Sequence, residues 1–176
     1  MDFSELVARQ RAYFESGATR TADFRLQALE KLRTALIRNE GVIFDALKAD
    51  LNKAPMESYM CENGLVLEEI RFHQKHLRRW MQNRRVPTPL AQFHARSFIA
   101  PEPYGVALIL SPWNYPIQLC LSPLVGAISG GNCVVVKPSA YAPQTSAAIA
   151  RLLGEAFPPG YIAVGGGGRA QDSALL

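Results

Sequence analysis

The stretch Gly-Val-Ala-Leu-Ile-Leu-Ser-Pro-Trp-Asn-Tyr-Pro at residues 105–116, together with Cys-Val-Val-Val-Lys-Pro-Ser at residues 133–139, decides the fold. Each stretch begins as a short apolar run of strand-forming residues and then reaches a polar residue followed by proline. Apolar residues between the two recur at helical spacing: Ile117, Leu121, Leu124, Val125 and Ile128. The order strand, helix, strand predicts a parallel pair joined by a right-handed crossover.

The pattern continues for one more helix and one more strand. Residues 143–157 open with a proline, which suits a first helical turn, and carry an apolar stripe at helical spacing. Residues 161–164 predict a third short strand, which runs into four glycines at 165–168. No Gly-Lys-Ser/Thr sequence follows these glycines, so they are interpreted as a flexible loop or an altered sequence. Three strands with two crossovers predict an α/β fold, a βαβαβ Rossmann-like half.

The composition limits the class of protein. A chain of 176 residues with 48% hydrophobic residues predicts a globular fold. No run of 18 apolar residues occurs and the N-terminus does not resemble a signal peptide, so we expect a cytoplasmic protein. The three cysteines, Cys61, Cys120 and Cys133, lack the Cys-x-x-Cys spacing of a zinc site. We interpret Cys120 and Cys133 as core residues.

Two polar residues follow neighbouring strands and are candidates for a functional site. Because the carboxyl ends of parallel strands meet at one edge of a sheet, Asn114 and Lys137 should share that edge. The Asn114 amide could donate a hydrogen bond to an oxygen that gains charge during attack on a carbonyl. Alternatively, it caps the helix that begins near Pro116. Lys137 faces either solvent or an anionic or hydroxyl-rich ligand.

At these residues the chain resembles the aldehyde dehydrogenases, and within them the class 3 type. The motifs that carry the resemblance are Pro-Tyr-Gly-Val at 103–106, Pro-Trp-Asn at 112–114 and Lys-Pro-Ser at 137–139. They occur in the family's order and spacing, after helices that also match, so the resemblance covers the whole chain. It implies an NAD(P)-dependent enzyme that oxidises fatty or aromatic aldehydes to carboxylic acids, with Asn114 as a catalytic residue.

The resemblance also implies a domain organisation. Residues 1–176 would form a partial cofactor-binding domain in three parts. Residues 1–82 are helical, residues 83–103 form a linker and an exposed edge strand from 93 to 102, and residues 104–176 form the βαβαβ unit. The edge strand resembles one arm of the family's oligomerisation hairpin, whose partner lies near the far C-terminus, so we expect a homo-oligomer, a dimer. The sequence leaves association with a membrane open.

Cofactor-binding residues follow from the same resemblance. Lys137 would contact the adenosine ribose, and the residues beside it in the cofactor site would be Ser111, Pro112, Trp113 and Ser139. We interpret Trp113 as a packing residue more than a stacking one. The family usually follows Lys-Pro-Ser with a glutamate that bonds the ribose hydroxyls, whereas this chain has Ala140. The change removes a carboxylate that would repel a 2′-phosphate. Either NADP is tolerated as well as NAD, or cofactor binding is weakened.

Some of the family's catalytic groups have no counterpart in this sequence. Family members use a cysteine nucleophile that forms a thiohemiacetal, a glutamate base and a Gly-Ser-Thr turn, all further along the family's chain than residue 176. We therefore expect the chain as given to be inactive by itself. The alternative to being part of such an enzyme is a catalytically inactive truncated fragment that acts as a structural or interaction module.

Two further clusters invite a functional interpretation. Residues 71–85 hold six basic residues and no acidic one, which is typical of a nucleic-acid contact, of a solvated helix and linker, or of a subunit contact. No base-reading motif accompanies them, so we predict no nucleic-acid partner. Glu69, His73 and His76 could face one way on a helix. No fourth ligand is evident, so we predict no metal site.

Overall fold

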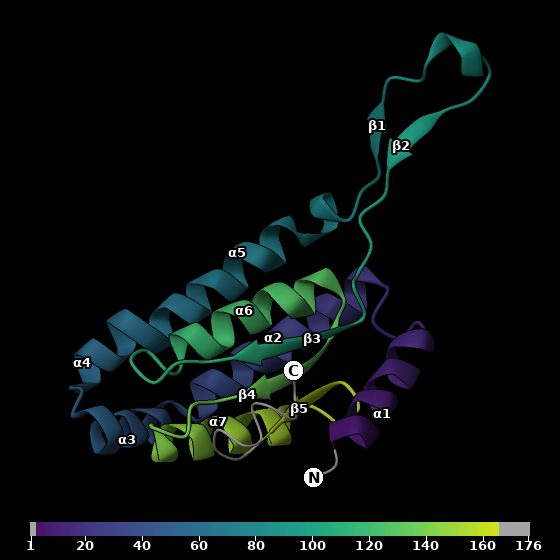
Figure 1. The fold of residues 1–176 in the computed structure, drawn as a ribbon. Helices are drawn as coiled ribbons and strands as arrows, with labels where there is room; N and C mark the ends of the chain where they lie inside the picture. The colour runs from purple at the N-terminus through teal and green to yellow at the C-terminus, as the bar shows by residue number, and fades with distance from the viewer. Residues whose placement is uncertain (1–2, 166–176) are drawn as a thin grey trace.

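The computed structural model describes residues 3–165, which form a helical part, a projecting hairpin and a parallel sheet with its crossover helices (Figure 1). The helical part comprises α1 (Phe3–Glu15), α2 (Ala22–Arg38), α3 (Glu40–Leu51), α4 (Pro55–Ser58), the π-helical turn η1 (Tyr59–Asn63) and α5 (Gly64–Trp80). The Thr21 side chain caps α2 by accepting a hydrogen bond from the Phe24 amide at 3.2 Å. Helices α2 and α3 are separate, with the break at Asn39.

The predicted βαβαβ unit is confirmed. It consists of β3 (Val106–Leu110), α6 (Gln118–Gly130), β4 (Cys133–Lys137), α7 (Pro143–Ala156) and β5 (Ile162–Val164). The three strands are parallel and lie in chain order, β3-β4-β5. In this register Leu110 is opposite Lys137 and Val136 is opposite Val164. The two strands that precede the candidate site therefore end at the same level of the sheet.

The sheet is covered differently on its two faces. Helices α6 and α7 pack on one face, where Val134 and Val136 join the main core, and α2, α3 and α5 form a further layer over them. On the other face Val135 packs against Leu6 of α1. Every residue of β4 is buried, whereas Leu110 of β3 is 47% exposed. Central strand β4 thus lies in the core while β3 is an open edge.

The turn between α6 and β4 depends on a glycine. Gly131 has φ +84°, and a Cβ at this position would collide with the guanidinium of Arg25. Arg25 is itself buried and donates hydrogen bonds to the carbonyls of Thr19 at 2.9 Å and Ser129 at 3.0 Å. This arginine ties the start of α2 to the end of α6, so the helical part and the βαβαβ unit share one core.

The segment before β3 differs from the prediction of a linker followed by one long strand. It forms an antiparallel hairpin that projects from the body of the molecule, made of β1 (Arg84–Val86), η2 (Leu90–Gln92) and β2 (Ser97–Ile99) (Figure 1). The Thr88 hydroxyl accepts the Ser97 amide at 3.0 Å and helps close the hairpin. The predicted strand at 93–102 is therefore wrong in its length, and its partner within the hairpin is β1.

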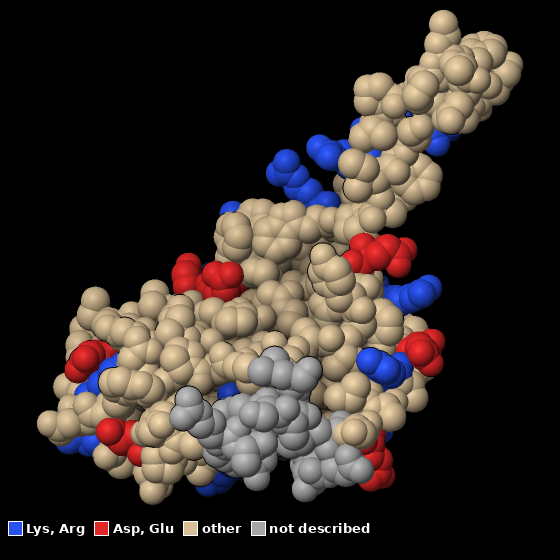
Figure 2. Space-filling view, in the orientation of Figure 1, with Lys and Arg blue, Asp and Glu red and all other residues tan. Residues whose placement is uncertain are grey.

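The surface charges of the basic stretch are partly paired. Arg71 lies 3.1 Å from Glu68, and Arg78 lies 2.5 Å from Asp23. Figure 2 shows basic and acidic side chains scattered in small groups over one face, with basic ones at the base of the hairpin. No helix in the part of the chain that the structure describes is long and apolar enough to cross a membrane.

Candidate functional site

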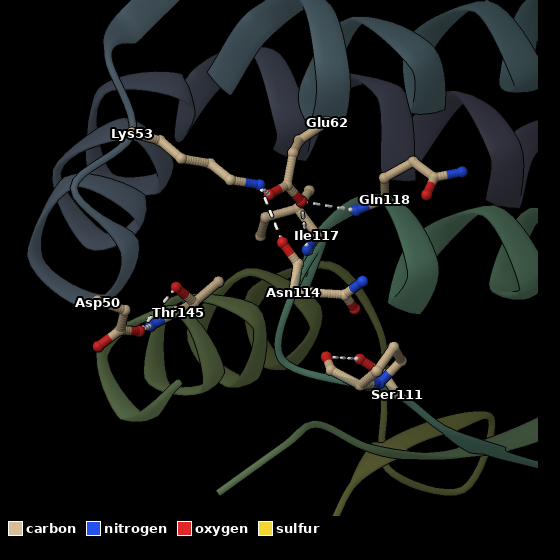
Figure 3. A network of polar contacts seen from close by, with 9 residues as sticks. Asp50, Lys53, Glu62, Ser111, Asn114, Ile117, Gln118 and Thr145 are labelled. Carbon is tan, nitrogen blue, oxygen red and sulfur yellow. Dashed lines mark hydrogen bonds and ion pairs between the residues drawn. The ribbon is translucent and has the colours of Figure 1, made fainter. Parts of the chain in front are cut away.

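The turn between β3 and α6 carries the first candidate residue (Figure 3). The amide of Ser111 donates to the carbonyl of Lys137 at 3.1 Å, which extends the pairing of β3 and β4 by one residue. Asn114 follows at this edge of the sheet, so the prediction that it shares an edge with Lys137 is confirmed. Its backbone carbonyl accepts a hydrogen bond from Lys53 at 3.1 Å. The side-chain amide is exposed, points away from Lys53 in Figure 3 and has no hydrogen-bond partner within residues 3–165.

The alternative role for Asn114, a cap on the following helix, is wrong. Helix α6 has no side-chain cap from the residue that precedes it. Its first amides are instead satisfied by Glu62, whose Oε2 accepts from Ile117 at 2.8 Å and from Gln118 at 3.1 Å. The Asn114 amide is therefore left available to a ligand.

Glu62 belongs to a buried ion pair that sequence reasoning missed. Its Oε1 lies 2.5 Å from the Lys53 ammonium, and the two side chains are 0% and 9% exposed. The same ammonium lies 4.0 Å from the centre of the Tyr115 ring. One signal was present in the sequence: Glu62 extends, at spacings of four, the apolar stripe of Val66 and Ile70. A glutamate on a buried helix face needs a partner.

The turn between β4 and α7 carries the other candidate residues. Lys137, at the end of β4, is 5% exposed. The Ser139 hydroxyl accepts the Tyr141 amide at 3.2 Å, and its carbonyl accepts the Ser146 hydroxyl at 2.7 Å. Asp50 of α3 caps α7, because its carboxylate accepts the Thr145 amide at 2.7 Å and the Thr145 hydroxyl at 2.8 Å.

A cavity of about 380 Å³ opens beside this turn. Small side chains and the end of β5 line it, among them Ser139, Ala140, Pro143, Ala147, Val164 and Gly165. Its size and mostly apolar walls, with serine hydroxyls near, suit part of a dinucleotide such as an adenosine group. It lies at the carboxyl end of the strands, where nucleotides bind in open α/β sheets. The residues present therefore fit the adenosine end of a nicotinamide dinucleotide.

The remaining predicted wall residues lie at the end of β3. Ser111 is 8% exposed and Trp113 is 53% exposed. Pro112, between them, is also exposed. The interpretation of Trp113 as a packing residue stays a prediction, because half of its surface is open within residues 3–165.

The buried cysteines are core residues, as predicted. Cys120 and Cys133 are both 0% exposed. Burial raises the pKa of Cys120 to about 12, although contact with the Ser111 side chain opposes the rise. Burial raises the pKa of Cys133 to about 11. Both thiols are protonated at neutral pH, so neither is an activated nucleophile.

The other clusters singled out in the sequence have local partners. His73 lies between the Ser129 hydroxyl, 2.7 Å from its Nδ1, and Glu69, 3.1 Å from its Nε2. No group of three metal-ligating side chains occurs in residues 3–165.

Gly165 donates to the Val136 carbonyl at 2.8 Å, whereas the other three glycines of the run lie outside the described residues.

Comparison with known proteins decides the family. The sequence model of the aldehyde dehydrogenase family matches residues 1–176. The chain belongs to this family. It is 40% identical over 166 residues to the 4,4′-diaponeurosporen-aldehyde dehydrogenase of Staphylococcus aureus, covering 94% of this chain and 36% of the relative. It is 39% identical over 172 residues to human aldehyde dehydrogenase family 3 member B1, covering 98% of this chain and 37% of the relative.

The fold agrees with that assignment. A structure of the substrate-bound state of Staphylococcus aureus AldH superposes with a TM-score of 0.96 at 38% identity, covering 98% of this chain and 38% of the other. The predicted α/β fold and class 3 resemblance are thereby confirmed. The chain spans about 36% of the length of the curated relatives it matches.

Proposed function

We propose that this chain forms the N-terminal part of an enzyme that oxidises aldehydes to carboxylic acids with NAD or NADP. The observation that carries the proposal is the meeting, at one sheet edge, of the available Asn114 amide with the Lys137 turn and its cavity. When bound, the dinucleotide supplies the hydride acceptor. Lys137 and Ser139 hold its adenosine end, beside a wall formed by Ser111, Pro112 and Trp113. Asn114 donates to the aldehyde oxygen as negative charge develops on it.

The substrates we propose are fatty or aromatic aldehydes. Support comes from the relatives named as family 3 members and from the relative named for 4,4′-diaponeurosporen-aldehyde. Cys120 and Cys133 are buried and protonated, so neither is the nucleophile we propose. We also propose that the nucleophile and the base come from another part of the enzyme, since this chain spans about 36% of the length of its relatives. The purified 176-residue protein should accordingly form no NADH from an aldehyde. Steady NADH formation by it would contradict this part of the proposal.

The function of Asn114 can be tested in a full-length chimera. Residues 1–165 of this chain would replace the matching segment of the staphylococcal relative, hereafter the chimera. Asn114→Ala should lower kcat on the order of a hundredfold or more, because the lost contact stabilises only the transition state. Gln82→Ala, which removes an exposed amide just after α5 and outside the hairpin, is the matched control and should leave kcat unchanged. An unchanged kcat in Asn114→Ala would refute the assignment.

The hairpin supports an oligomeric assembly, which is also the basis of the second candidate function, a structural or interaction module. Leu90 is 88% exposed and Phe93 is 75% exposed at its far end. Such apolar surface on a projecting element is typical of a protein interface. We propose a homodimer through this element. Sedimentation of the chimera should give a dimer, and Leu90→Glu with Phe93→Glu should shift it toward monomer. A wild-type monomer would contradict the proposal.

A further inference from the structure

We infer that Lys53 and Glu62 are positioning residues that set the direction of the Asn114 amide by clamping the backbone of residues 114–118. The inference rests on the proposed function of Asn114. It assigns a role to a buried ion pair that lies on the helical part of the chain and would otherwise look like a mere packing feature.

The geometry of the pair singles out this turn. Glu62 divides its carboxylate between two tasks: Oε1 pairs with the Lys53 ammonium at 2.5 Å, and Oε2 accepts the amides of Ile117 at 2.8 Å and Gln118 at 3.1 Å. Lys53 in turn donates to the Asn114 carbonyl at 3.1 Å. The pair therefore holds the turn at the carbonyl of the residue that presents the amide and at two amides three and four positions later (Figure 3).

Capping α6 alone does not require this arrangement. A serine or aspartate just before the helix would satisfy its first amides at little cost. Burying two charges is expensive, and apolar replacements of a buried ion pair are often as stable or more so. What an apolar pair cannot provide is the hydrogen bond from Lys53 to the Asn114 carbonyl. The ionic pair thus does something beyond supporting the fold.

An irregular backbone turn places Glu62 near the start of α6. Glu62 lies in the π-helical turn η1, and such turns are rare and are frequent at functional sites. The turn brings the chain so close to itself that a Cβ at Gly64 would lie 2.7 Å from the Tyr59 carbonyl oxygen. Only glycine fits there, so the sequence maintains an irregular turn that places Glu62 opposite the start of α6.

The Asn114 side chain depends on its backbone for direction. Its amide has no hydrogen-bond partner within residues 3–165, so no neighbouring side chain orients it there. Misplacing a catalytic group by about 1 Å can cost on the order of a hundredfold in rate. A clamp on the adjacent carbonyl and amides is therefore expected to act on turnover.

The test replaces the pair in the chimera by Lys53→Met with Glu62→Leu, which fills a similar volume without charge. Thermal stability should fall by little more than the loss of a helix cap, because the two buried charges leave together but the amides of Ile117 and Gln118 lose their acceptor. The kcat should fall about tenfold or more, with KM for aldehyde and cofactor changed less than about twofold, because only transition-state alignment is lost. Should this variant fail to fold, Lys53→Met with Glu62→Gln replaces it in every comparison, because that neutral pair keeps an acceptor for the two amides and removes only the hydrogen bond to the Asn114 carbonyl.

A matched control disturbs the same turn without touching residues 114–118. Asn63, the next residue of η1, is fully buried and donates to Glu40 at 3.1 Å. Asn63→Leu should leave kcat, expressed per folded enzyme molecule, within about twofold of the parent. An equal loss of kcat in this control would mean that any damage to η1 lowers turnover, and would overturn the inference.

A double-mutant cycle separates positioning from an independent contribution. If the pair acts through Asn114, removing it in an Asn114→Ala background should cause no further fall in kcat. A further tenfold loss there would overturn the inference. If Asn114→Ala lowers kcat in the chimera but the Lys53 and Glu62 replacements do not, the positioning role is refuted and the proposed function of Asn114 still stands. A chimera inactive before any substitution would refute the proposed function, and the inference with it.

Discussion

The N-termini of α6 and α7 are both capped by carboxylates from distant helices, yet the two caps lie in different surroundings. Glu62, which caps α6, is fully buried and paired with Lys53. Asp50, which caps α7, is only partly buried, and its contacts are with Gln144 and Thr145 of the helix itself. Neither helix is capped by the residue that precedes it.

The difference matches what each preceding turn is proposed to do. The turn before α6 presents Asn114, whose contribution depends on alignment in the transition state, and this turn is clamped by a buried ion pair. The turn before α7 presents Lys137 and Ser139, which would meet the cofactor equally before and during the reaction. Uniform binding requires less accurate placement. A partly exposed cap is sufficient for it.

The largest expected effect is on stability, where the two caps can be compared directly. In the chimera, Glu62→Ala should lower the free energy of unfolding by about 3–5 kcal/mol, because it leaves the Lys53 charge buried without a partner. Asp50→Ala should cost about 1 kcal/mol, the usual loss for a helix cap. Urea denaturation of the two variants and the parent measures both values.

A surface pair provides the control for this comparison. Glu30 and Arg33 form an exposed pair at 2.9 Å, so Glu30→Ala should change stability by less than about 0.5 kcal/mol. Equal losses in Glu62→Ala and Asp50→Ala would show that the buried cap and the partly buried cap are equivalent, and would remove the distinction between the two turns.

The next effect concerns the cofactor. Lys137→Ala in the chimera should raise the dissociation constant of the dinucleotide about tenfold or more, the value of a hydrogen bond to a charged group, while leaving kcat nearly unchanged. Lys75→Ala, at an exposed position of α5, is the control. Titration of cofactor fluorescence gives the constants. A fall in kcat with unchanged binding would place Lys137 in the chemistry and erase the contrast with Asn114.

The sheet could be predicted from the sequence because its signals are local. Apolar runs ended by Ser111-Pro112 and Lys137-Pro138 mark where strands stop, and the observed strands β3 and β4 end within one residue of those points. The shared edge of Asn114 and Lys137 then follows from parallel pairing alone. This part of the candidate site required no knowledge of distant contacts.

The clamp and the hairpin could not be predicted for the opposite reason. Glu62 caps a helix that starts 56 positions later in the chain, and Asp50 accepts from the first turn of a helix at a separation of 95 positions. The sequence around α6 and α7 does not indicate which distant residues cap these helices. Strand β1, Arg-Arg-Val, lacks an apolar alternation, so only its pairing with β2 reveals it as a strand.

The smallest expected effect, and the one most specific to this chain, is at Ala140. This residue is exposed beside the cavity next to Lys137, where a glutamate would place a carboxylate near the ribose of the proposed cofactor. Ala140→Glu in the chimera should shift the ratio of the NADP and NAD dissociation constants about fivefold toward NAD, since repulsion of a 2′-phosphate at an exposed site is weakened by salt. Ala140→Gln has nearly the same shape without the charge and should shift the ratio much less. The charge-dependent part should shrink as ionic strength rises, which a steric effect would not do. If glutamate and glutamine shift the ratio equally at all salt concentrations, the carboxylate is not near a 2′-phosphate, and the ribose does not lie beside the turn that precedes α7.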